Sequence, residues 1–99
     1  MPTTTIPVHW VNGQPQADNV TITTEGENTI QWVPDSGITI TGISGLPNPP
    51  FTQQPTSANN WTADDDNTSA GTYNYTIAGT NDLLGVSGTH DPQITNEPE

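Results

Sequence analysis

Lysine and arginine are absent from this sequence, which carries 11 aspartates and glutamates in 99 residues and a formal net charge of −11. Because soluble domains are about a quarter charged with both signs present, a chain of this length without cations has a chance probability on the order of 10⁻⁵ or below. The absence excludes cationic phosphate clamps and catalytic lysines or arginines. The uncompensated negative charge repels phosphate backbones and anionic lipids, so we expect no nucleic-acid and no membrane partner, only nonspecific inorganic cations.

Cysteine is also absent, which excludes disulfides, thiolate nucleophiles and cysteine-ligated metals. No stretch approaches the ~18 apolar residues of a membrane-spanning helix. The opening Met-Pro-Thr-Thr-Thr has neither the charged nor the apolar region of a signal peptide, so we expect no targeting segment, and the localisation stays open. No segment has a sustained apolar period of about 3.6 residues, so we expect almost no helix.

The residues that are present favour a folded, β-rich chain. Hydrophobic residues make up only 28% and the mean hydropathy is −0.61, yet three Trp, two Tyr and regularly spaced Ile and Val argue against disorder. Threonine favours strands, whereas Asn, Pro and Gly favour turns. The length predicts one domain over residues 1–99 with short flexible termini, and we expect a monomer.

Alternating apolar side chains predict the strands. Ile6, Val8 and Trp10 share one face of the first strand, and Pro7 marks that strand as an edge. A turn at residues 25–28 is expected to join strands at 20–23 and 29–33 as a hairpin. Long loops are expected at residues 46–60 and 79–88. Further strands are expected at residues 38–43, 61–63, 71–78 and 91–96.

About seven short strands separated by turn residues predict an all-β fold, an antiparallel Greek-key β-sandwich. One face of each strand would supply its core, and burial of a large side chain is worth about 1.5–3 kcal/mol before conformational entropy is subtracted. The side chains predicted to be buried are Ile6, Val8, Trp10, Val20, Ile22, Ile30, Trp32, Ile40, Phe51, Trp61, Tyr73, Tyr75, Ile77 and Ile94.

Two segments resemble cupredoxins, the family of small β-sandwiches that includes the blue copper proteins. Val20-Thr21-Ile22 followed by Glu25-Gly26-Glu27-Asn28-Thr29-Ile30-Gln31-Trp32 resembles the family's strand, turn and strand ending in Trp. Gly71-Thr72-Tyr73-Asn74-Tyr75-Thr76-Ile77 resembles its Gly-Thr-Tyr-x-Tyr-x-Cys segment. The final Asp91-Pro92-Gln93-Ile94-Thr95-Asn96 is similar to a pattern in small uncharacterised bacterial proteins of cupredoxin-like fold. The resemblance implies a cupredoxin-like sandwich.

The positions of the copper ligands depart from the family. Where the family has its copper-binding cysteine this chain has Ile77, and the histidine expected after Trp32 and the histidine and methionine expected after Ile77 are missing. A blue copper site needs two imidazoles and a thiolate with a weak axial ligand. The resemblance therefore implies a sandwich without copper, and we expect no cofactor, no metal site and no catalytic residues.

Two groups of residues are candidate metal ligands, and each has a simpler interpretation. His9 and His90 could form a metal pair if the first and last strands were neighbours, but two histidines are a poor zinc site, so we interpret them as surface or edge residues. The segment Asp64-Asp65-Asp66-Asn67 could bind a hard cation. Because three consecutive carboxylates cannot all converge on one ion from an extended segment, we interpret it as a solvated acidic turn.

Three tryptophans could stack on sugar rings beside paired catalytic carboxylates, namely Trp10, Trp32 and Trp61. The alternation places two of them inward, so we interpret them as core residues. We find no Ser-His-Asp arrangement and no phosphate-binding glycine loop, and the sequence predicts a protein that is not an enzyme. The glycosylation pattern occurs four times, which we attribute to composition, at Asn19, Asn60, Asn67 and Asn74.

Our leading hypothesis is a non-enzymatic, metal-free cupredoxin-like domain whose cations were removed by design, to ask whether folding needs ion pairs. Uncharged residues occupy outward strand positions where sandwiches often carry lysine, namely Thr21, Thr23, Gln31, Thr39 and Asn74. The alternative is an acidic, Ca²⁺-binding β-sandwich module of a bacterial extracellular adhesin, since residues 75–82 resemble the strand ends of such repeats. A third hypothesis, an acidic domain of a salt-loving organism, predicts unfolding at low salt.

Overall fold

Strands dominate the computed structural model, which describes residues 2–98. Within that range the chain forms eleven strands and one 3-10 turn, η1 (Ser57–Asn59). The all-β fold is therefore confirmed, while the expected number of about seven strands is too low. Met1 and Glu99 belong to the predicted flexible termini and lie outside the described residues. The strands are β1 (Thr3–Val11), β2 (Gln14–Ala17), β3 (Val20–Ile22), β4 (Asn28–Pro34), β5 (Ile38–Ser44), β6 (Phe51–Gln53), β7 (Thr62–Asp65), β8 (Gly71–Asn74), β9 (Thr76–Asn81), β10 (Val86–His90) and β11 (Gln93–Asn96).

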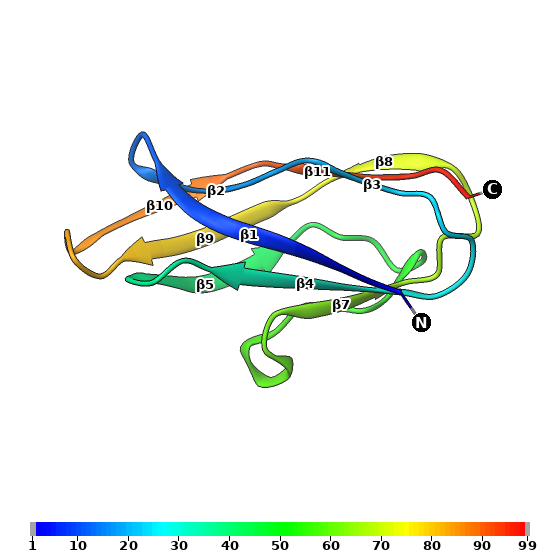
Figure 1. The fold of residues 1–99 in the computed structure, drawn as a ribbon, viewed down its shortest axis with the longest axis horizontal. Coiled ribbons are helices and arrows are strands. Elements are labelled where there is room, and N and C mark those ends of the chain that lie inside the picture. The colour runs from blue at the N-terminus through cyan, green and yellow to red at the C-terminus, as the bar shows by residue number, and fades with distance from the viewer. Residues whose placement is uncertain (1, 99) are drawn as a thin grey trace.

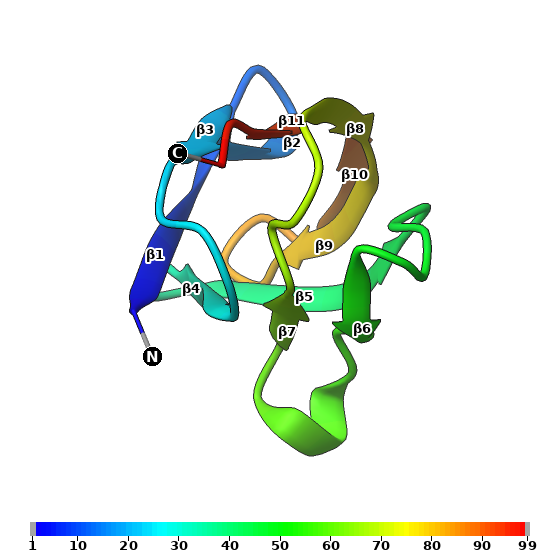
Figure 2. The same ribbon diagram turned by 90° about the vertical axis from the view of Figure 1, so that its right-hand side faces the viewer.

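The strands form three sheets around one core. Their orders are β2-β1-β4-β7-β6, β10-β9-β5 and β3-β11-β8. Viewed along the long axis, β3, β11 and β8 lie on one side, β4, β5, β7 and β6 lie on the other, and β1 and β9 slant across the flanks (Figure 2). Both described ends of the chain lie at the same end of the molecule (Figure 1). No helix among residues 2–98 is long and apolar enough to cross a membrane.

The strand pairing is mixed, so the fully antiparallel arrangement expected from the sequence is wrong. β1 pairs in parallel with β4, and β11 pairs in parallel with β3. The expected hairpin at 20–33 is also wrong, because β3 and β4 belong to different sheets and residues 23–27 cross between the two sides (Figure 2). The buried Asn28 amide holds this crossing segment by donating to the carbonyls of Thr24 and Gly26, both at 2.8 Å.

Pro7 does not mark an edge strand, since β1 lies between β2 and β4. The carbonyl of Pro2 accepts a hydrogen bond from Thr29 in β4, and the carbonyl of Val8 accepts one from Asp35, just after β4. The backbone groups of neighbouring residues in a strand point to opposite sides, so those of Pro7 point away from β4. On that other side β2 reaches only as far as Ala17, opposite Val8. Proline therefore stands where the strand has no neighbour, and its missing N–H costs no hydrogen bond.

Several expected boundaries differ from the structure. The loop at 46–60 contains β6 and η1, and the loop at 79–88 is the hairpin of β9 and β10. The expected strand at 71–78 is divided at Tyr75, where the chain passes from the β3-β11-β8 sheet to the β10-β9-β5 sheet. The short strand expected at 61–63 extends through Asp65, into the segment interpreted as a turn.

The core matches most of the predicted set. Val20, Trp61 and Tyr73 are only partly buried but pack against it, whereas Trp10 is half-buried and outside this cluster, which corrects its assignment. A bulge between Ile40 and Gly42 shifts the alternation of β5, so Ile43 also faces inward. The buried hydrophobic side chains are Ile6, Val8, Ala17, Ile22, Ile30, Trp32, Ile40, Ile43, Leu46, Phe51, Ala63, Tyr75, Ile77 and Ile94.

Candidate functional site

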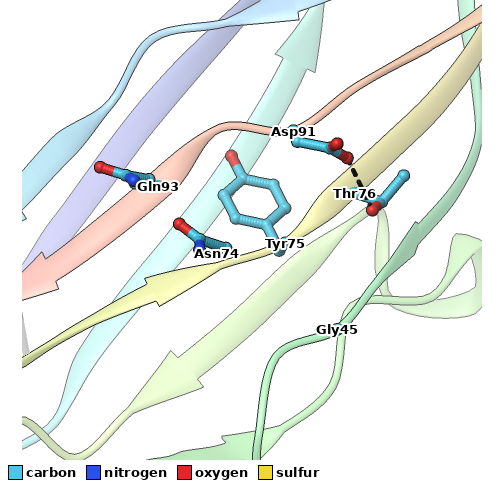
Figure 3. A pocket seen from close by; sticks show the side chains of 6 residues that line it. All are labelled: Gly45, Asn74, Tyr75, Thr76, Asp91 and Gln93. Carbon is cyan, nitrogen blue, oxygen red and sulfur yellow. Dashed lines mark hydrogen bonds between the residues drawn. The ribbon is translucent and has the colours of Figure 1, made fainter.

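A surface hollow of about 420 Å³ lies where β8 passes into β9. It offers one carboxylate, that of Asp91, which accepts a hydrogen bond from Thr76 Oγ1 at 2.8 Å (Figure 3). Glycoside hydrolysis needs two carboxyl groups, one as acid and one as base or nucleophile. The hollow can therefore hydrogen-bond a polar molecule but has no acid–base pair. Its lining residues are Gly45, Asn74, Tyr75, Thr76, Asp91 and Gln93.

The two histidines bond to different partners. His9 is exposed and donates from Nδ1 to Asp35 Oδ2 at 2.6 Å. That hydrogen bond and the charge of Asp35 raise the pKa of His9, so protonated His9 stabilises the fold below pH 6.5, and this contribution is lost as the pH rises through the raised pKa. His90, on the edge strand β10, accepts a hydrogen bond from the Gln14 amide at 3.2 Å. Each histidine thus has a hydrogen-bond partner of its own.

The acidic segment at 64–67 is not the solvated turn expected from the sequence. Asp64 and Asp66 are half-buried, but Asp65 and Asn67 have exposed fractions of 0%. The reason is that β7 continues through Asp65, so alternate side chains point inward, and Asp65 shares its face with Ala63. The charges of three consecutive aspartates concealed this alternation.

Asp65 belongs to a buried polar network with Asn67 and Asn96. Its Oδ1 accepts from the backbone N–H of Asn67 at 3.0 Å and from the side-chain amide of Asn96 at 2.8 Å. The Asn67 amide donates to the carbonyls of Ile22 and Thr24 at 3.2 and 2.7 Å. Burial raises the pKa of the Asp65 carboxyl, because desolvation outweighs the two hydrogen bonds that favour its ionised form.

Sequence reasoning missed Asn96, although a signal was present. Ile94 is fully buried, and Asn96 lies two residues further along β11 on the same face. A polar residue on the inward face of a strand calls for a buried partner. That partner, Asp65, comes from a strand 31 residues away, which a single sequence does not reveal.

Trp32 cannot stack on a sugar ring, because its side chain is only 1% exposed. Its ring packs edge-on against Tyr75, with centroids 5.6 Å apart and planes at 71°, and its Nε1 donates to the Tyr75 hydroxyl at 2.9 Å. Trp61 and Trp10 are half-buried. Among the glycosylation patterns, the Asn67 side chain is fully buried and donates to two carbonyls, so it is inaccessible to an oligosaccharide.

The buried tyrosine predicts a loss of stability at high pH. Desolvation raises the pKa of Tyr75 from 10.0 to about 12, although the hydrogen bond from Trp32 acts in the opposite direction. A tyrosine of the unfolded chain ionises first, so this contribution is lost as the pH rises from about 10 to about 12, by roughly 2–3 kcal/mol. Urea unfolding at several pH values measures it. Tyr75→Phe should lose less stability over this interval, and equal losses in both proteins would contradict the assignment.

Within residues 2–98, no group of three or more histidine, aspartate or glutamate side chains is placed to hold a metal ion. Asparagine oxygens can also bind hard cations, and two asparagines lie in the network around Asp65. Comparison with known proteins adds no functional assignment: no protein-family model matches the chain, and no curated protein matches it significantly. The candidate functions therefore depend on the residues and their geometry.

Proposed function

We propose that this chain is a non-enzymatic, copper-free cupredoxin-like sandwich of Greek-key type, with a surface stripped of cationic side chains by design. The observation that carries the proposal is Ile77, which stands where the family has its copper thiolate and is fully buried in the apolar core. An apolar side chain there packs instead of binding metal. Its role is structural, a fold that holds together without lysine or arginine.

The positions of the segments that resemble cupredoxins support the proposal of a cupredoxin-like fold. The segments at 20–22 and 71–74 form β3 and β8, and both pair with β11, which carries the third resembling pattern. The tryptophan and tyrosine of the first two segments, Trp32 and Tyr75, are hydrogen-bonded in the core. Three stretches far apart in the chain thus meet in one structural unit.

The exposure of the outward strand positions supports the proposal that cationic side chains were removed by design. Thr21, Thr23, Thr39 and Asn74 are exposed, and Gln31 is half-buried. At exposed positions a long cationic side chain needs no room in the core and would lie among carboxylates. These sites are therefore compatible with lysines in a parent sequence.

Restoring lysine tests this proposal. A variant with Thr21→Lys, Thr23→Lys, Thr39→Lys and Asn74→Lys changes the net charge from −11 to −7. We expect the same fold by NMR and a higher Tm at low salt, because self-repulsion falls, with the difference shrinking as salt screens the charges. Glutamine at the same four positions is the neutral control. Loss of folding in the lysine variant but not in the glutamine variant would contradict the proposal.

A second function, a Ca²⁺-binding module of an extracellular adhesin, is favoured by one observation. Asp65 and two asparagines form a buried cluster rich in oxygen atoms, the ligand type that Ca²⁺ prefers. In a string of modules, Ca²⁺ would also stiffen the junctions between neighbours. Small-angle scattering of two linked copies tests this function separately from ion binding, since only a module of this kind predicts a more extended particle when Ca²⁺ is added.

A further inference from the structure

Three residues linked by hydrogen bonds each bury one oxygen atom that has no hydrogen-bond donor. These atoms are Asp65 Oδ2, Asn67 Oδ1 and Asn96 Oδ1, and all three residues have exposed fractions of 0%. Buried polar side chains are almost always hydrogen-bonded, and leaving one unsatisfied is costly. All three atoms are acceptors, so the partner that would satisfy them is electropositive.

The orientation of these groups is fixed by their neighbours. Asn96 must present its amide to the Asp65 carboxylate, because a flipped side chain would set two oxygens against each other. Asn67 directs its amide at two carbonyls, so its own oxygen points away from them. Because the Asn67 backbone and the Asn96 amide both bond Asp65 Oδ1, the three residues are held together around one carboxyl group.

No cationic side chain of this protein can compensate the Asp65 carboxylate. The sequence has no lysine or arginine, His9 bonds Asp35, and His90 bonds Gln14. A buried charge is ordinarily paired or bound to a metal. The compensating positive charge must therefore come from solvent, as a proton or as a metal ion.

A count of the acceptors distinguishes these possibilities. A proton on Asp65 Oδ2 neutralises the carboxyl but can be donated to only one asparagine oxygen, so a water molecule is needed as well. One water molecule donates two hydrogen bonds and leaves one oxygen and the charge. One hard cation between the three oxygens would satisfy all of them and neutralise the carboxylate without any further molecule. We propose that Asp65, Asn67 and Asn96 bind a single hard metal cation through these three oxygens, with Ca²⁺ as the best match to a carboxylate and two amides.

The site lies where two segments cross between the sides of the sandwich. Residues 23–27 and 66–70 run together at one end of the molecule, and Asn67 bonds the first segment at Thr24 (Figure 1). Thr68, Ser69 and Ala70, which follow Asn67, are exposed, so the buried oxygens lie next to a segment that faces solvent. Bound cation would tie β7 to β11 at this junction. With one carboxylate, we expect a Kd of about 10⁻⁴ to 10⁻³ M.

Thermal unfolding with added Ca²⁺ at constant ionic strength tests the site. Mass action predicts that Tm rises with the logarithm of the Ca²⁺ concentration above Kd, by about 10–20 °C at a concentration a hundred times Kd. Asp65→Asn should lose this rise, whereas Asp64→Asn, which makes the same change in net charge on the same strand, should keep it. A rise of equal size in both variants, or no rise specific to Ca²⁺ in the unaltered protein, would overturn the proposal.

A site-specific measurement on the unaltered protein keeps the test independent of whether Asp65→Asn folds. The side-chain amide NMR signals of Asn67 and Asn96 should shift with Ca²⁺ along one saturation curve, at the concentrations that raise Tm. Signals that respond to pH but not to Ca²⁺ would instead assign the missing positive charge to a proton. The proposal rests on burial and hydrogen bonding alone, so it stands or falls separately from the copper-free and designed origin of the chain.

Discussion

Replacing Trp32 by alanine is expected to destabilise the protein by about 3–5 kcal/mol, enough to unfold a marginally stable domain. Trp32 is 1% exposed, and its loss removes both the packing against Tyr75 and the hydrogen bond to the tyrosine hydroxyl. A cavity of indole size would open in the core beside Tyr75. Urea unfolding followed by far-UV circular dichroism measures the change.

Trp10→Ala is the matched control, since it removes the same side chain from a half-buried position outside the core cluster. We expect a distinctly smaller loss for this variant. Equal losses for Trp10 and Trp32 would mean that the Trp32–Tyr75 contact is not central to the core. Tyr75→Phe adds a finer comparison, because it leaves the indole N–H buried without its acceptor, at a cost of about 1–3 kcal/mol.

Replacing Gly88 by alanine is expected to cost about 1–3 kcal/mol, because β10 passes very close to the β1–β2 turn. A Cβ at Gly88 would lie 2.5 Å from the Gly13 carbonyl oxygen and 3.1 Å from Gln14 Cα. Both are backbone atoms that cannot rotate away, so the strand and the turn would have to separate. The midpoint of urea unfolding reports the loss.

Gly42→Ala provides the control for this substitution. A Cβ at Gly42 would meet no heavy atom within 4 Å. We therefore expect little change, or a gain of a few tenths of a kcal/mol from the smaller conformational freedom of the unfolded chain. If alanine were tolerated equally at both positions, the close approach of β10 to the turn would be wrong.

The alternation of apolar residues predicted the inward faces better than the strand partners. Ile6 and Val8 in β1, and Ile30 and Trp32 in β4, were placed correctly because their period of two depends on local sequence alone. Pairing depends on segments far apart, so the parallel neighbours β1 and β4 could not be found, and a hairpin was expected instead.

The burial of the acidic segment also depends on residues far apart in the chain. Asp65 continues the inward face of β7, but an aspartate is rarely fully buried, so a solvated turn was the natural expectation. Its burial depends on hydrogen bonds from Asn67 and Asn96, and Asn96 lies in the last strand. Local sequence can show which face a residue occupies, but the tertiary partners determine whether a charge can stay there.

The balance of charge gives the protein few ionic contacts. Among residues 2–98, one ion pair is present, between His9 and Asp35, and both side chains are exposed. Exposed pairs stabilise a protein by about 0–1 kcal/mol. Stability must therefore come from the apolar core and the backbone hydrogen bonds, against the mutual repulsion of the carboxylates. Salt should help by screening this repulsion, without being required for folding.

Urea unfolding at pH 7 in low salt tests this account most directly, because urea is uncharged and does not itself screen carboxylates. The account predicts one cooperative transition at low ionic strength, with a midpoint that rises gradually as NaCl is added. A chain that is unfolded in low salt and folds only in molar salt would contradict the claim that the core holds this cation-free β fold together.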